Sequence, residues 1–129
     1  MVKRYDVKGV NSPQGRFSHV GEIGPNARFY YLAGQTGVAP DGSVAADFAG
    51  QARQVYANIA DVLAECGMSF SDVVRINAFV TRREHFAGYM AVRDRYIGDP
   101  PPASTLVVVS GFTRPEFLVE VEVTAVAAE

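Results

Sequence analysis

Residues 47–67 read DFAGQARQVYANIADVLAECG and give the strongest indication of the fold. Its apolar side chains recur at spacings of three and four residues, the period of one face of an α-helix. These positions are Phe48, Ala52, Val55, Ile59, Val62 and Cys66. Asp47 suits the N-cap and Gly67 the residue just past the helix. Such a helix is about 30 Å long, so it needs a broad sheet to cover.

Segments with the composition of β-strands lie on both sides of this helix. Residues 72–81 are rich in β-branched side chains, and residues 118–127 alternate between apolar and polar positions. The other predicted strands are 3–8, 17–23, 28–33 and 103–110. Thr81 and Glu84 have the spacing of a capping box, which predicts a second helix that ends before Gly98. This order predicts an α+β fold with both helices on one face of a mixed sheet.

Composition narrows the class of protein. The 129 residues fit a single domain, 1–129, with 48% apolar and 20% charged residues. The net charge is −2 and the basic residues are scattered, so we expect no nucleic-acid partner. No apolar run approaches the ~20 residues of a membrane span, and no apolar stretch follows the N-terminus as in a signal peptide. A single cysteine, Cys66, suits a reducing compartment, so we expect a cytoplasmic protein without membrane contact.

Six short motifs follow one another in a characteristic order. They are Gly15-Arg16-Phe17-Ser18-His19, Leu32-Ala33-Gly34-Gln35, Gln51 with Asn58, Gly67-Met68-x-Phe70-x-Asp72-Val73-Val74, Pro102-Ala103-Ser104-Thr105, and Val119-Glu120-Val121-Glu122. Together they resemble the RidA (YjgF-like) family of small enamine/imine deaminases over residues 14–127. The resemblance implies a chorismate-mutase-like fold and a homotrimer with small-molecule clefts between its subunits.

The strand pattern gives independent support for an oligomer. Both helices can cover only one face of the sheet. The other face carries Phe79 and Leu118 among polar residues, together with Thr105 and Val107 if the register holds. A half-apolar sheet face usually needs a partner.

Glu120 is the candidate catalytic residue. The resemblance implies that its carboxylate positions the water that attacks an imine carbon, which is the work of a general base. The sequence alone also allows a solvated carboxylate on the polar face of an edge strand. Glu122 shares that face, and we interpret it as structural or solvated.

The family's substrate-binding arginine has no counterpart here. In members that deaminate amino-acid-derived imines it follows Pro-Ala and pairs with the substrate carboxylate through two hydrogen bonds. Depending on the alignment, Ala103 or Ser104 occupies that position, and no arginine lies between Arg95 and Arg114. The expected substrate-binding set is Phe17, Ala33, Gly34, Ala103, Ser104, Thr105 and Arg114.

Three further departures remove polar groups from the same cleft. Phe17 replaces a tyrosine, Ala33 replaces a serine, and Met90 appears in place of an asparagine. The hypothesis that follows is a substrate less acidic than a 2-imino acid. Among the basic residues that could replace the missing arginine, Arg114 is the first candidate, whereas Arg16 and Arg75 are interpreted as surface charges.

The two histidines do not form a metal site. His19 and His85 are far apart in sequence and have no Cys, His or carboxylate companions at ligand spacing, so we expect no metal and no cofactor. His85 is interpreted as a surface residue, whereas His19 falls near the cleft loop and could contact a ligand. Cys66 is interpreted as a small core residue rather than a nucleophile.

Three functions are compatible with these residues. The first is hydrolysis of an enamine or imine to a carbonyl compound and ammonia. The second is a non-catalytic trimer that binds a small ligand or a partner. The third is another reaction in an adapted cleft, on an amino-aromatic or ring-cleavage product.

Overall fold

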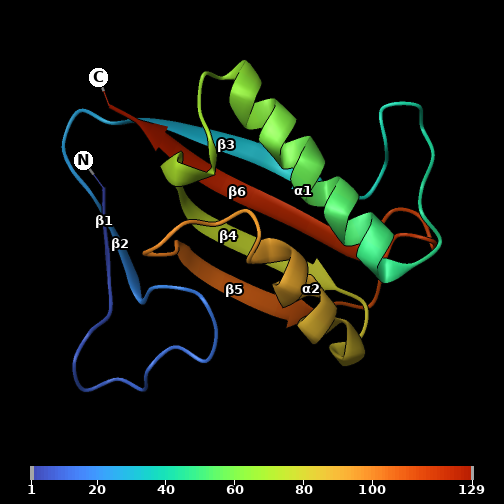
Figure 1. Ribbon diagram of the computed structural model, residues 1–129, viewed down its shortest axis with the longest axis horizontal. Coiled ribbons are helices and arrows are strands. Elements are labelled where there is room, and N and C mark those ends of the chain that lie inside the picture. The colour runs from blue at the N-terminus through green and yellow to red at the C-terminus, as the bar shows by residue number, and fades with distance from the viewer. Residues whose placement is uncertain (1, 129) are drawn as a thin grey trace.

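The computed structural model describes residues 2–128, and its centre is a four-stranded mixed sheet (Figure 1). Its strands are β3 (Arg28–Gln35), β6 (Val119–Ala127), β4 (Val73–Val80) and β5 (Ala103–Val108), in that spatial order. β6 runs antiparallel to β3 and β4, whereas β5 is parallel to β4. β1 (Val2–Tyr5) and β2 (Val20–Ile23) form a separate antiparallel pair.

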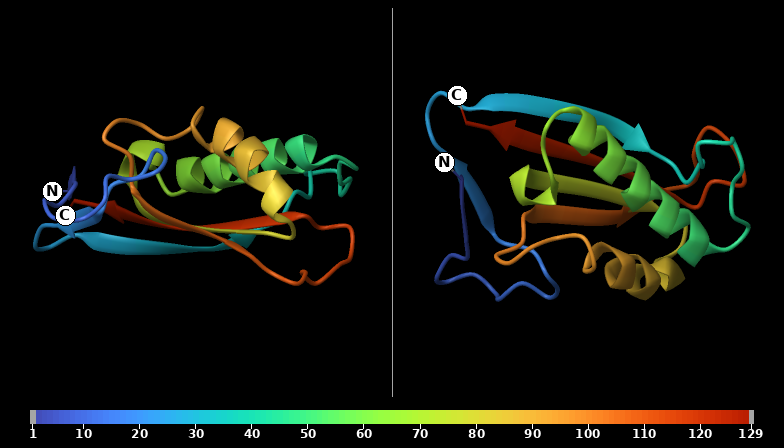
Figure 2. Two further views of the ribbon diagram at one scale, coloured as in Figure 1. Left: turned by 90° about the horizontal axis from the view of Figure 1, so that it is seen from below. Right: turned by 45° about the horizontal axis from the view of Figure 1, so that its top comes forward.

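Two helices cover one face of the central sheet and leave the other face open (Figure 2). They are α1 (Phe48–Glu65) and α2 (Phe86–Arg93). Short 3₁₀ turns at Phe70–Asp72 and Arg83–His85 precede β4 and α2. This arrangement confirms the predicted α+β fold with a mixed sheet and two helices on one side.

The core is built from buried residues that alternate with less buried ones along the central strands. Every second residue of β4 and β6 is buried under the helices, as the sequence pattern predicted. On α1 the buried apolar side chains are Ala52, Val55, Tyr56, Ile59 and Leu63. Arg75, Asn77 and Phe79 point to the open face together with Glu120, and all four are only half-buried.

The predicted helix stripe is wrong at its C-terminal end. Val62 is 37% exposed and Cys66 is exposed, so Cys66 is not the core residue that we expected. A step of four residues from Ile59 leads to Leu63, which is fully buried. Because four residues turn the helix by about 400°, Leu63 stays closer to the buried face than Val62 does. Cys66 is the C-cap, and Gly67 follows it with φ 73°, as predicted.

The predicted capping box at Thr81 and Glu84 is also wrong. The backbone N–H of Thr81 donates to Leu118 O, which continues the pairing of β4 with the segment before β6. Its hydroxyl is buried without a hydrogen-bond partner in the described structure, and the second helix begins only at Phe86. That helix ends at Arg93, earlier than expected. A capping box does form at Ser69 and Asp72.

Two N-terminal strands are shorter than predicted. Residues 17–19 precede β2 as a loop rather than as strand. Ser18 explains why: its N–H donates to Pro102 O and its hydroxyl to Pro101 O, which ties this loop to the start of β5 instead of to a strand ladder. β1 likewise ends at Tyr5.

Candidate functional site

Glu120 lies on the open face of the sheet against the backbone of Gly34. An ideal Cβ built on Gly34 would lie 2.1 Å from Glu120 Oε2 and 2.9 Å from its Cδ. Any side chain at position 34 would therefore displace the carboxylate. Glu120 pairs with Phe79 in the register of β4 and β6, so an aromatic ring borders it on the other side.

A β-bulge brings Gly34 close to this carboxylate. Leu32 pairs with Val123 and Gln35 pairs with Val121, so β3 has one more residue than β6 between these pairs. The bulge takes Ala33 and Gly34 out of the regular register, and both are exposed on the open face. The backbone of the bulge and the carboxylate of Glu120 therefore lie together and form the first group of expected site residues.

Gln51 and Asn58 of α1 hold the loops around this group. Gln51 is 1% exposed, and its amide donates to Ala45 O and Glu116 O and accepts from Leu118 N. The amide of Asn58 donates to Val38 O at 2.9 Å. These bonds fix the loop after β3 and the loop before β6, and so fix where Glu120 enters the sheet.

A second group of expected site residues lines a cavity of about 280 Å³ at the edge of β5. Its walls come from the loop at Gln14–Phe17, from α2 and from β5. The residues are Gln14, Gly15, Phe17, Phe86, Met90, Arg93, Ser104, Thr105 and Leu106. The loop is pinned on both sides of Phe17, because Arg16 donates to Asp94 O and Gly98 O and Ser18 donates to the prolines before β5.

The two groups lie on opposite faces of the same sheet. Ser104 pairs with Ile76, whose side chain is buried under the helices. Glu120 pairs with Phe79, which points to the open face. Because paired residues share a face, the side chains of Ser104 and Glu120 cannot meet within one chain. Thr105 pairs with Asn77 and so belongs to the open face, but it also lines the cavity because β5 is the edge strand of the sheet.

The three arginines considered as replacements already have partners. The guanidinium of Arg114 bonds the Glu116 carboxylate and lies 4.9 Å from the centre of the Phe117 ring. The pKa of Glu116 is lowered, first by a backbone hydrogen bond and then by Arg114. Arg75 donates to the hydroxyl of Thr105 at 2.8 Å.

The sequence reasoning missed Arg93, which lines the cavity. It is 3% exposed, and its Nη2 lies 3.0 Å from Asp94 Oδ1. The signal was present, because Arg93 follows Met90 by three residues and so shares its side of α2.

The histidines have structural partners. His19 Nδ1 accepts from Val7 N at 3.0 Å, and Nε2 contacts Asn11 O at 2.9 Å, so the ring ties the loop before β2 rather than lining either group. His85 stacks on Phe48 with ring centres 4.1 Å apart. Burial lowers the pKa of His85. Within residues 2–128 no three His, Cys, Asp or Glu side chains are grouped to hold a metal.

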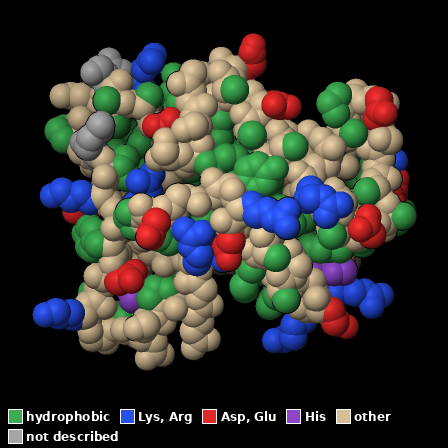
Figure 3. All heavy atoms as spheres, viewed as in Figure 1, with side chains coloured by type: hydrophobic (Ala, Val, Ile, Leu, Met, Phe, Trp, Pro, Cys, Tyr) green, Lys and Arg blue, Asp and Glu red, His purple; other side chains and the backbone are tan. Residues whose placement is uncertain are grey.

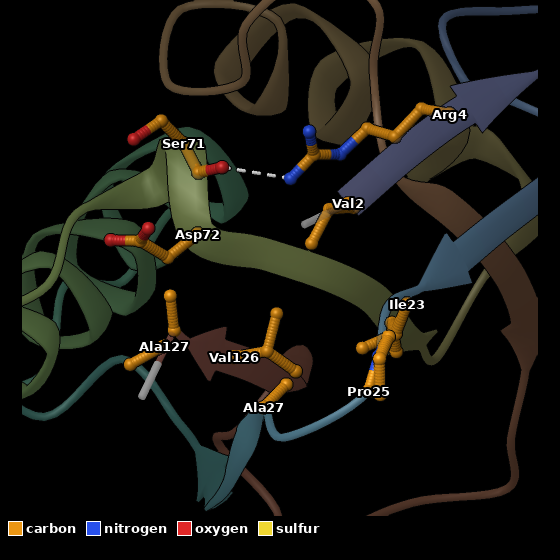
Figure 4. A pocket seen from close by; sticks show the side chains of 10 residues that line it. Val2, Arg4, Ile23, Pro25, Ala27, Ser71, Asp72, Val126 and Ala127 are labelled. Atoms are coloured by element: carbon orange, nitrogen blue, oxygen red, sulfur yellow. Dashed lines mark hydrogen bonds between the residues drawn. The ribbon is translucent and has the colours of Figure 1, made fainter.

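Another cavity, of about 210 Å³, lies where β1 and β2 meet the end of β6 (Figure 4). Arg4 borders it, with Nη2 bonded to Ser71 O and Val73 O, and most of the other lining side chains are apolar. None of the expected site residues is among the described residues that line it. It is separate from the candidate site.

The charged side chains and the length of the helices bear on the expected partners. On the face viewed in Figure 3, basic and acidic side chains are interspersed rather than gathered by sign. No helix within residues 2–128 is both long and apolar enough to cross a bilayer.

Comparison with known sequences identifies relatives of this chain. The family model described as Endoribonuclease L-PSP matches residues 10–127. Protein HMF1 of Saccharomyces cerevisiae is 35% identical over 100 residues, covering 77% of this chain and 75% of that protein. Protein DfrA of Myxococcus xanthus is 32% identical over 133 residues, covering 98% of both.

Solved structures share the fold over nearly the full length. YyfB from Yersinia pestis, described as a protein of unknown function of the conserved Rid family, superposes with a TM-score of 0.88 at 28% identity, and the match covers 98% of both chains. RidA from an Antarctic Psychrobacter has a TM-score of 0.73 at 27% identity, covering 97% of this chain and 99% of its own. This chain belongs to the Rid family, also described as YjgF or L-PSP.

Proposed function

We propose that this protein is an enamine/imine deaminase that hydrolyses a reactive C=N compound to a carbonyl compound and ammonia. The observation that carries the proposal is the Glu120 carboxylate lying over the Ala33-Gly34 bulge on the open sheet face. Family membership supports it, because Rid proteins are generally enamine/imine deaminases.

The chemistry needs few groups, because an imine carbon is already electrophilic. Glu120 orients a water molecule and accepts a proton as the C–O bond forms. The proton then passes to the nitrogen, the C–N bond breaks, and ammonia leaves while the carbonyl forms. The bulged backbone at Ala33 and Gly34 supplies polar groups that orient the reacting atoms.

The complete site in this proposal lies between subunits of a homotrimer. Glu120 and the cavity residues face opposite sides of one sheet, so a cleft that contains both needs a second chain. The open face also carries Phe29 and Tyr31, which stack with ring centres 6.2 Å apart and are 49% and 78% exposed. Exposed aromatic area of this kind favours an interface with another copy.

The substrate in this proposal is less acidic than a 2-imino acid. Position 103 is alanine and position 104 is serine, so the cavity has no arginine on β5 to pair with a carboxylate. Phe17 and Met90 line the same cavity and contribute apolar surface.

We also propose that the protein is cytoplasmic, because its free, exposed Cys66 suits a reducing environment.

The test compares a neutral imine with an acidic one of similar size. An amine oxidase acting on phenethylamine produces the neutral imine, and an L-amino acid oxidase acting on phenylalanine produces the 2-imino acid. Ammonia release above the spontaneous rate is measured with and without the protein. We expect acceleration of both, with the neutral imine preferred. Equal rates of ammonia release with and without the protein would refute deaminase activity. Faster release from the acidic imine than from the neutral one would refute the proposed substrate class.

The non-catalytic alternative has one observation in its favour. Most of the surface that lines the cavity beside Phe17 is apolar, which also suits simple binding of a small ligand. Thermal stabilisation by a ligand without any acceleration of imine hydrolysis would favour this binding role over catalysis. Ribonuclease activity is not proposed, because a net charge of −2 offers little attraction to phosphate backbones.

A further inference from the structure

Gln14 and Thr105 are among the residues that line the cavity beside Phe17, and two further polar groups there are not used by the proposed reaction. One is the guanidinium of Arg93 on α2, and the other is the hydroxyl of Ser104 on β5. The remaining walls are mainly the apolar side chains of Phe17, Phe86, Met90 and Leu106. A cavity of mostly apolar walls with a few convergent polar groups is typical of a small-molecule site.

Arg93 is buried, but its charge is compensated. Its Nε and Nη2 lie 3.1 and 3.0 Å from the same Asp94 oxygen, and the guanidinium lies 5.8 Å from the centre of the Tyr89 ring. Nη1 makes no hydrogen bond within the described part of the chain. Arg93 therefore presents donors to the cavity while its net charge is balanced by its neighbour.

The loop over Arg93 is built to approach it closely. Gly15 has φ 150°, a backbone conformation that favours glycine, and an ideal Cβ there would lie 3.8 Å from Arg93 Nη2. Arg16 ties this loop to the carbonyls of Asp94 and Gly98. The guanidinium is consequently enclosed by the loop on one side and α2 on the other.

Ser104 Oγ is buried and has no hydrogen-bond partner in the described structure. Buried hydroxyls are almost always hydrogen-bonded, because an unpaired one loses its water without compensation. Ser104 lines the cavity, so a rotation of its side chain about the Cα–Cβ bond would turn the hydroxyl toward a molecule there and give it the missing partner.

We propose that Arg93 and Ser104 together anchor an uncharged oxygen of the substrate, such as an amide, ester or ketone carbonyl. The apolar part of the substrate then lies against Phe17 and Met90. A carboxylate fits less well, because Asp94 already neutralises the guanidinium and would repel a second anion. The inference rests on the proposed function, whose substrate it specifies further, but it can be tested by binding alone.

The experiment measures binding of two nearly isosteric probes, 3-phenylpropanamide and 3-phenylpropanoate, to the full-length protein by calorimetry. The wild type should bind the amide more tightly than the carboxylate. Ser104→Ala should weaken amide binding about three- to tenfold, the value of one hydrogen bond. Asp94→Asn leaves the guanidinium uncompensated, so it should improve carboxylate binding about tenfold relative to the amide. Arg95→Gln, at an exposed position two residues further along, is the matched control and should change neither affinity.

Contrary results overturn the inference. They are tighter carboxylate than amide binding by the wild type, no binding of either probe, or an amide-to-carboxylate ratio unchanged by both variants. Circular dichroism and thermal melting verify that each variant is folded, and Ser104→Ala removes only one oxygen atom. Glu120→Gln separates the two proposals, because it should keep amide binding while losing turnover. If the amide binds with the expected variant effects but the protein does not accelerate imine hydrolysis, the binding role of Arg93 and Ser104 is supported and the deaminase activity is refuted.

Discussion

Replacing Gly34 by alanine displaces the Glu120 carboxylate without disturbing the core. The added Cβ would lie 2.1 Å from Oε2, so that oxygen must retreat by about 1.3 Å to reach the 3.4 Å at which ordinary contact begins. Gly34 has no positive φ, so alanine causes no backbone strain. A misplacement of about 1 Å can cost on the order of 100-fold in rate, which is the loss in kcat/KM that we expect.

Stability and activity should separate in this variant. Because Glu120 is a flexible, half-buried side chain, we expect the melting temperature of Gly34→Ala to stay within a few degrees of wild type. Gly37→Ala is the contrasting case, since its Cβ would lie 2.9 Å from backbone atoms of Gln51 in α1 and should destabilise the fold. Gly111→Ala meets nothing within 4 Å and should change neither property.

The assay is the rate of ammonia release from the neutral imine, measured alongside thermal melting for the three glycine variants. Full turnover in Gly34→Ala would refute the placement of Glu120 at the reaction centre. A fall in melting temperature as large as that of Gly37→Ala would show instead that position 34 is structural.

Three further predictions concern stability. Gln51→Ala removes hydrogen bonds to three backbone groups and should lower the free energy of unfolding in urea by roughly 3 kcal/mol, whereas exposed Arg53→Ala should leave it nearly unchanged. Tyr56→Phe breaks the 2.7 Å bond between the buried hydroxyls of Tyr56 and Tyr89 and should cost about 1–2 kcal/mol, part of which the double Phe variant recovers. Burial lowers the pKa of His85, so its stabilising contribution is present above about pH 6.5 and lost as pH falls toward the folded pKa. His85→Phe should therefore flatten that part of the pH profile of unfolding, and an unchanged profile would contradict this.

The sheet and helices could be predicted because their periodicities are strong. Alternating apolar residues in β4 and β6 and the three- and four-residue spacing of α1 each favour one structure. Boundaries were less accurate where local signals compete with tertiary contacts. Thr81 has the sequence of a helix cap, yet it extends the strand pairing through Leu118, and Ser18 binds the prolines before β5 instead of joining β2.

The candidate site could be predicted only in part. The resemblance identified Glu120 and Gly34, and the bulge that joins them became visible only from the register of β3 and β6. The division of the site between two sheet faces also depends on register, which a list of motifs does not contain. The spacing from Met90 indicates which side of α2 Arg93 occupies, but its burial and its enclosure by the loop at Gly15 are tertiary properties.

In the proposed reaction, the carboxylate of Glu120 drives hydrolysis of an imine. The most direct test is the rate of ammonia release by Glu120→Gln compared with Glu122→Gln, a matched change two residues along the same strand face. We expect a loss of 100-fold or more, on the order of a general base's contribution, for Glu120→Gln and near wild-type rates for Glu122→Gln. Equal rates in the two variants, or an unchanged rate in Glu120→Gln, would contradict it.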